Sequence, residues 1–138
     1  MIVRPYSIAL DSEALSALSL RDPQIRLWAE MARRTDSVLY ASAATLAEVA
    51  DGTPRDARIR IAVKAVRVVP VTTEIGFRAG SLRSTAAPSR RKRRDLTVDA
   101  LVAATALSLP APVIVLMSDP NDVRLLLSGT SVRVEQLG

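Results

Sequence analysis

Five acidic residues carry the chemistry that this sequence can do. The 138-residue chain contains no His and no Cys, so it lacks both the usual general base near neutral pH and the thiolate nucleophile or metal ligand. Any hydrolytic reaction must therefore depend on carboxylates, hydroxyls, Lys or Arg side chains, or a bound ion. The acids that their positions single out are Asp11, Glu48, Asp99, Asp119 and Asp122.

Two of these acids, Asp11 and Asp119, come after apolar runs. Asp11 directly follows residues 6–10, and Asp119 lies just beyond residues 113–117. Both runs predict buried strands. Because sites in open α/β sheets form beyond the carboxyl ends of the strands, we expect these two acids to converge. Each also has a simpler interpretation, as the N-cap of the helix that follows.

The other three acids lie in predicted helices. Asp99 and Asp122 fall in first turns, where a negative charge suits the helix dipole without any further function. Glu48 lies between Ala47 and Val49 in a mostly apolar or small stretch, and it is otherwise interpreted as a residue of an exposed helix face.

Convergence of these acids would require a cation. Like charges within a few ångström raise one another's pKa and reduce stability, and a bound cation offsets that repulsion. With only hard oxygen ligands available, the expected ion is Mg²⁺ or Mn²⁺. Such an ion activates water and stabilises the charge that develops on a phosphate. The five acids therefore predict metal-dependent phosphodiester hydrolysis.

Strands alternating with helices predict an α/β fold with a central parallel sheet. The predicted strands are residues 6–10, 37–41, 66–71, 113–117 and 131–135. The predicted helices are residues 14–20, 23–34, 42–50, 55–64, 73–84, 96–109 and 119–128. We expect Thr73 to cap the fifth helix and Asp119 to cap the last. The length and the 49% hydrophobic content fit one domain over residues 1–138.

Five of the chain's basic residues are adjacent in one short run. The chain has 19 Lys and Arg against 14 Asp and Glu, a net charge of +5 that favours a polyanionic partner. Residues 86–95 predict a basic mobile loop, directly before the helix that carries Asp99. The interpretation we favour is that the run binds RNA phosphates; the alternative is a solvated surface loop. The run consists of Arg90, Arg91, Lys92, Arg93 and Arg94.

Four short patterns in order resemble the PIN domain, and more closely the VapC-type ribonuclease toxins of toxin–antitoxin pairs. They are residues 8–12, 45–49, 98–106 and 118–122, so the resemblance covers nearly the whole chain. It implies a Rossmann-like three-layer α/β/α fold and a Mg²⁺- or Mn²⁺-dependent endoribonuclease that forms a homodimer. It also implies inhibition by a cognate antitoxin, a segment of which occupies the acidic pocket and the adjoining groove.

The resemblance also implies roles for individual residues. Asp11, Glu48 and Asp99 match the three best-defined acids, Asp119 matches the fourth, and Asp122 matches an additional acid. Ser12 and Ser118 match small polar positions that orient ligands or waters. The chain departs from the pattern at Glu13, which adds charge near the pocket, at Met117, which removes a hydroxyl, and at Asn121, which replaces an acid.

Two classes of function fit these observations. The first is the endoribonuclease toxin, with Asp11, Asp99, Asp119 and Asp122 as metal ligands and Asp11, Glu48, Asp99 and Asp119 as catalytic acids. The alternative is a catalytically silent PIN-like module that binds RNA or protein. Nothing in the sequence separates RNA from DNA as the nucleic acid. No apolar run approaches the ~20 residues of a membrane span, and we expect a cytoplasmic protein.

Overall fold

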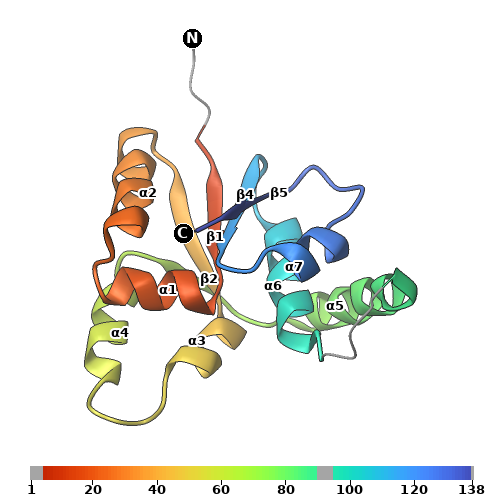
Figure 1. Ribbon diagram of the computed structural model, residues 1–138, viewed down its shortest axis with the longest axis horizontal. Coiled ribbons are helices and arrows are strands. Elements are labelled where there is room, and N and C mark those ends of the chain that lie inside the picture. Colours follow the sequence, from red (N-terminus) through yellow and green to blue (C-terminus); the bar gives the residue numbers. More distant parts are fainter. Residues whose placement is uncertain (1–4, 90–94, 138) are drawn as a thin grey trace.

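The central element of the structure is a parallel sheet. A computed structural model describes residues 5–89 and 95–137. In these residues five strands form one sheet in the order β3-β2-β1-β4-β5, and every neighbouring pair is parallel (Figure 1). The strands are β1 (Ser7–Leu10), β2 (Val38–Ser42), β3 (Arg67–Val69), β4 (Val113–Met117) and β5 (Arg133–Gln136). The predicted parallel α/β architecture is confirmed.

Helices cover both faces of this sheet, which gives three layers (Figure 1). The helices are α1 (Ser12–Ser19), α2 (Pro23–Arg34), α3 (Ala43–Val49), α4 (Asp56–Val63), α5 (Thr73–Ala86), α6 (Thr97–Ser108) and α7 (Asn121–Leu126). Helices α1, α2 and α4 lie to one side of the sheet, and α5, α6 and α7 lie to the other. Within the described residues, no helix combines the length and the apolar character that crossing a membrane requires.

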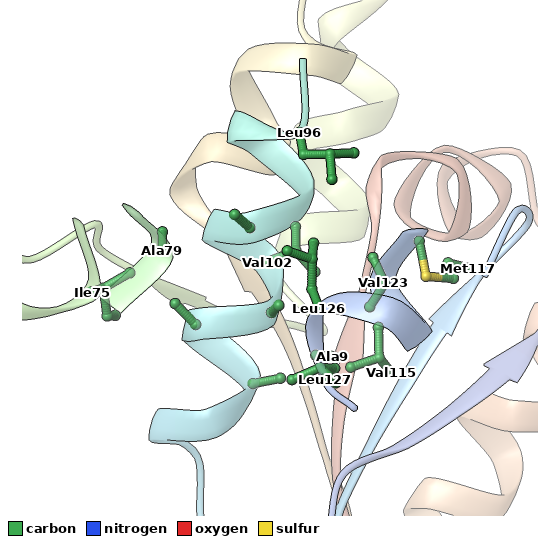
Figure 2. Close-up of a cluster of buried hydrophobic side chains, with 14 of the residues drawn as sticks. Ala9, Ile75, Ala79, Leu96, Val102, Val115, Met117, Val123, Leu126 and Leu127 are labelled. Carbon is green, nitrogen blue, oxygen red and sulfur yellow. The ribbon is translucent and has the colours of Figure 1, made fainter. Parts of the chain in front are cut away.

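The central strands are buried on both faces, as expected for a parallel sheet between helical layers. Successive residues of β1 point to opposite sides: Ile8 packs in the cluster beneath α1 and α2, whereas Ala9 packs in the cluster beneath α5, α6 and α7. Figure 2 shows the second cluster, in which Ala9, Val102, Val115 and Val123 come from β1, α6, β4 and α7. Two continuous apolar cores therefore hold the strand ends in fixed positions.

The predicted elements are all present, and their ends differ in informative ways. Strand β3 contains only three residues, Arg67–Val69, because it forms one edge of the sheet and pairs on one side alone. Helix α5 is capped by Thr72 and not by Thr73 as predicted: Ile75 N donates to Thr72 Oγ1 over 3.2 Å.

Helix α5 also continues to Ala86, and Ala87–Ser89 form a 3₁₀ turn, so regular structure extends into the first residues of the predicted basic loop. Residues 90–94 of that loop lie outside the described residues.

Candidate functional site

The carboxyl ends of three adjacent strands define the candidate site. Leu10 at the end of β1 is in register with Ala41 of β2 and Leu116 of β4. The next residue, Asp11, is held to β4 because its backbone N–H donates to Leu116 O over 3.1 Å. Its carboxylate is also fixed, since Ala14 N donates to Asp11 Oδ1 over 2.8 Å. Asp11 is therefore the predicted N-cap of α1 and lies at the predicted edge of the sheet.

The carboxyl group of Asp11 has a raised pKa. Its pKa is raised from 3.8 to about 6, chiefly by burial, although the hydrogen bond from Ala14 N acts in the opposite direction. The neighbouring carboxylates of Glu13, Asp99 and Glu48 contribute to the same rise. These four acids come from three separate helices and share one electrostatic field. Glu48 and Asp99 thus lie near enough to raise the pKa of Asp11, and their joint role with it as one site stays a prediction.

The other two members of this trio approach Asp11 on packed helices. Glu48 is exposed in the last turn of α3, and Asp99 is half-buried in the first turn of α6. Helix α3 packs against both α1 and α6, which brings its acid toward the start of each. On the same helix Thr45 is fully buried, and its Oγ1 has no hydrogen-bond partner within the described structure.

The predicted supporting residue Ser118 contacts an acid that the sequence prediction had left out of the site. Ser118 Oγ donates to Glu13 Oε2 over 2.7 Å, a bond that joins the exit of β4 to the first turn of α1. Glu13 had been noted only as extra charge near the pocket. Its position two residues after Asp11 was the signal that places it beside the site. Ser12, the first residue of α1, is half-buried.

The remaining predicted acids lie farther along the exit of β4. Asp119 is exposed, and it does not cap the next helix as predicted: α7 begins at Asn121 with Pro120 in the capping position and no side-chain cap. Asp122 is half-buried in the first turn of α7. Neither acid is among the groups that chiefly raise the pKa of Asp11. Their roles as metal ligands stay predictions.

The predicted phosphate-binding run, Arg90 to Arg94, lies outside the described residues. Asp95, directly after it, accepts a hydrogen bond from the backbone N–H of Thr97, the first residue of α6, over 2.9 Å. Arg83 of α5 approaches the same oxygen at 3.9 Å.

The donor chemistry of the acidic cluster fits a hard divalent cation. Its available ligands are carboxylate oxygens, which Mg²⁺ and Mn²⁺ prefer. The pKa of Asp11 is raised chiefly by burial and in part by repulsion from neighbouring carboxylates, and a cation would relieve that repulsion. In residues 5–89 and 95–137, however, no three acidic side chains are close enough together to hold one ion. The described arrangement therefore has the right ligand types and a more open spacing than a formed metal site.

Comparisons with known proteins agree with this architecture. Residues 8–121 match the model of the PIN domain family. The search of curated proteins finds no match. Among solved structures, the chain resembles one in VapBC2 from Rickettsia felis bound to a promoter DNA fragment, with a TM-score of 0.73, 13% identity, and coverage of 94% of this chain and 97% of that one.

Two further structures show the same fold. One is DNA-bound VapBC from Salmonella typhimurium, with a TM-score of 0.65, 19% identity, and coverage of 95% of this chain and 98% of that one. The other is FitAcB from Neisseria gonorrhoeae, with a TM-score of 0.64, 18% identity, and coverage of 91% of this chain and 96% of that one.

Proposed function

This chain belongs to the PIN domain family, and on that premise we propose that it is a Mg²⁺- or Mn²⁺-dependent endoribonuclease, the toxin of a type II toxin–antitoxin pair in the cytoplasm. One observation carries the proposal: the half-buried carboxyl group of Asp11 lies near the carboxylates of Glu13, Glu48 and Asp99, which raise its pKa. A fold gains no stability from collecting like charges at one edge of a sheet. A bound cation gives that arrangement a use.

We assign the following roles. Asp11 and Asp99 hold the ion, and Asp119 and Asp122 complete its surroundings from the exit of β4. When bound, the ion supplies a Lewis acid and lowers the pKa of a water ligand. The backbone bond to Leu116 O and the cap from Ala14 N keep the Asp11 carboxylate in place. We assign to the exposed carboxylate of Glu48 the role of accepting the proton of the attacking water.

The proposed partners follow from the structural relatives. The similar chains come from VapBC and FitAcB complexes, two of them bound to DNA. By analogy, we propose that a cognate antitoxin inhibits this chain by occupying the acidic site and the adjoining groove, and that the active form is a homodimer. We propose RNA as the substrate.

The open spacing of the acids supports one alternative, a catalytically silent module that binds RNA or protein. Such a module needs no ion at Asp11, so its activity would not respond to metal.

Cleavage of total RNA with and without EDTA tests the proposal. The wild-type chain should cleave RNA in Mg²⁺ or Mn²⁺ and lose this activity in EDTA. Asp99→Asn should lower the rate at least about 100-fold, because metal-assisted catalysis loses a ligand. It should also stay folded and relieve growth inhibition. Asp36→Asn is the matched control: Asp36 is exposed at φ 55°, a backbone conformation that Asn tolerates.

Equal cleavage by Asp99→Asn and wild type in EDTA would exclude the metal-dependent enzyme. RNA binding without turnover, unchanged by metal, would favour the silent module.

A further inference from the structure

A cavity at the amino edge of the sheet has basic walls. Its volume is about 410 Å³, and it lies between the end of α2 and the first residues of β2 and β3. The charged side chains that line it are Arg33, Lys64 and Arg67, with no Asp or Glu among the lining residues. Arg33 pairs with Glu30, whereas Lys64 and Arg67 form no ion pair with any described residue. Two cations are therefore available to an anionic ligand.

Helix α4 extends this positive charge toward the candidate site. It belongs to the connection between the parallel strands β2 and β3, so it returns from the carboxyl edge of the sheet to the amino edge. Arg60 lies one turn before Lys64 on the same side of the helix. It lines a second cavity, of about 250 Å³, together with Leu46 of α3, the helix that carries Glu48. Arg60, Lys64 and Arg67 are all exposed, and we call them the α4 basic surface.

We propose that the α4 basic surface binds backbone phosphates of single-stranded RNA, and so holds the substrate at a distance from the cleaved bond. The inference rests on the proposed function for its choice of RNA, and its evidence is independent of the acidic cluster. Residues 55–67 contain five basic residues and one acidic residue, a net charge of +4 in a chain whose total is +5. The segment is therefore one of two strongly basic stretches of the chain, the other being Arg90 to Arg94 with a charge of +5.

The character of the surface favours a nucleic acid over an acidic protein. A protein interface is built around a core of large apolar and aromatic anchors. The amino-edge cavity has Ala29, Ala32 and Ala65 among its lining residues, and the larger Leu39 and Val66 that also line it are buried in the core. No aromatic residue is among its lining residues, and Ile61 of α4 is a large apolar side chain exposed nearby. Residues 55–67 contain no aromatic residue on which a base could stack. Binding should therefore depend on phosphates and be insensitive to base sequence.

The distance between the α4 basic surface and the acidic site determines how long an RNA must be to contact both. Strand β2 contains five residues, which corresponds to about 17 Å between the two edges of the sheet. An RNA that keeps the ~3.4 Å spacing of a stacked strand covers this distance with roughly five nucleotides, and a more extended strand with fewer. An RNA of about 12 nucleotides is therefore long enough to contact both edges.

Fluorescence anisotropy with a labelled single-stranded RNA of mixed sequence, about 12 nucleotides long, tests the inference at several salt concentrations. The protein is the full chain carrying Asp99→Asn, which prevents cleavage. Arg60→Gln/Lys64→Gln/Arg67→Gln in this background should raise the Kd roughly 10-fold or more, and it should reduce the slope of log K against log salt by about 2, the value for three lost single-strand contacts. Arg90 to Arg94 stay intact, so the remaining slope reports other contacts.

Arg21→Gln/Arg26→Gln/Arg78→Gln is the matched control, because it removes the same charge from exposed residues outside the surface. Its Kd should stay within about 3-fold of the Asp99→Asn chain. Both triple variants replace exposed side chains, so their thermal midpoints should agree. An unchanged Kd and slope in the first triple overturn the inference and leave the surface to an acidic protein partner. Equal losses in both triples also overturn it, since they report net charge alone.

The two proposals fail separately in this design. A chain that binds RNA through the surface but never cleaves it contradicts the proposed function only. A chain that cleaves RNA while the first triple binds like the control contradicts the present inference only.

Discussion

The amino and carboxyl ends of the parallel strands, which form two opposite edges of the sheet, differ in how well the polar groups near them are satisfied by hydrogen bonds. At the carboxyl edge, the half-buried Asp11 lies near like charges that raise its pKa, and the buried Thr45 hydroxyl has no partner in the described structure. At the amino edge, Ser7 Oγ donates to Pro110 O over 2.6 Å, and Thr105 on α6 donates to Leu101 O over 2.7 Å. Unfavourable local choices in a folded protein tend to mark functional sites. The carboxyl edge gives up stability that the amino edge keeps.

The largest expected effect is that of Asp11→Asn on the free energy of unfolding, measured without metal. Asn caps a helix as well as Asp does, so the variant keeps the bond from Ala14 N and loses the charge. The folded-state pKa of about 6 exceeds the ordinary 3.8, so ionisation destabilises the folded protein by up to about 3 kcal/mol. Below pH 3.8 both states bind the proton, and the variant should match wild type. As the pH rises through 6, the free energy of unfolding of wild type should become lower than that of Asp11→Asn by about 1–3 kcal/mol.

Urea denaturation in EDTA between pH 3.5 and 8 measures this difference. Asp36→Asn, an exposed carboxylate, should show no such pH-dependent gain. At pH 7.5, added Mg²⁺ should stabilise wild type, because a ligand that binds only the native state raises its stability; Asp11→Asn should respond less. A difference between variant and wild type that is independent of pH would show that the charge of Asp11 is not the cause.

The elements that set this contrast were largely predictable from sequence. Central strand β4, Val113–Met117, was predicted to the residue, because a continuous apolar run between turn residues has few other structures. Asp11 was predicted to lie beyond the carboxyl end of β1, where sites of parallel sheets form, and its backbone bond to Leu116 O holds it there. Asp99, in the first turn of a helix, was assigned to the same site by the resemblance to the PIN domain, and that assignment stays a prediction.

The features that were wrong or missed depend on geometry that periodicity does not contain. The cap of α5 is Thr72 rather than Thr73, a choice between adjacent hydroxyl residues that one backbone turn decides. Asp119 does not cap α7, because Pro120 takes that position. Glu13 was missed as a site residue because its role depends on the exit of β4, 105 residues away along the chain. The cavity with Lys64 and Arg67 forms only when α2 meets β3.

A pair of buried threonines tests the same contrast on a smaller scale. Thr45 and Thr105 are both helical and at most 2% exposed, and they differ in hydrogen bonding: Thr105 donates to Leu101 O, whereas Thr45 has no partner in the described structure. Thr45→Val removes an unsatisfied hydroxyl at almost constant volume and should stabilise the protein by about 1 kcal/mol. Thr105→Val loses a satisfied bond and should destabilise it by about 1 kcal/mol.

Chemical denaturation of the two variants under identical conditions gives both values, and each threonine serves as the control for the other. Losses of equal size would show that Thr45 has a partner, such as an ordered water, and that the carboxyl edge is better satisfied than the protein groups alone indicate.

The smallest expected effect concerns the bond across the carboxyl edge from Ser118 to Glu13. Both partners are accessible to solvent, so Ser118→Ala should destabilise the protein by only about 0.5–1 kcal/mol. Ser128→Ala, at an exposed serine just beyond α7, should change stability by less than this. In a double-mutant cycle, Ser118→Ala should cost nothing once Glu13→Ala has removed the acceptor. An equal cost in both backgrounds would mean that Ser118 acts through a group other than the Glu13 carboxylate.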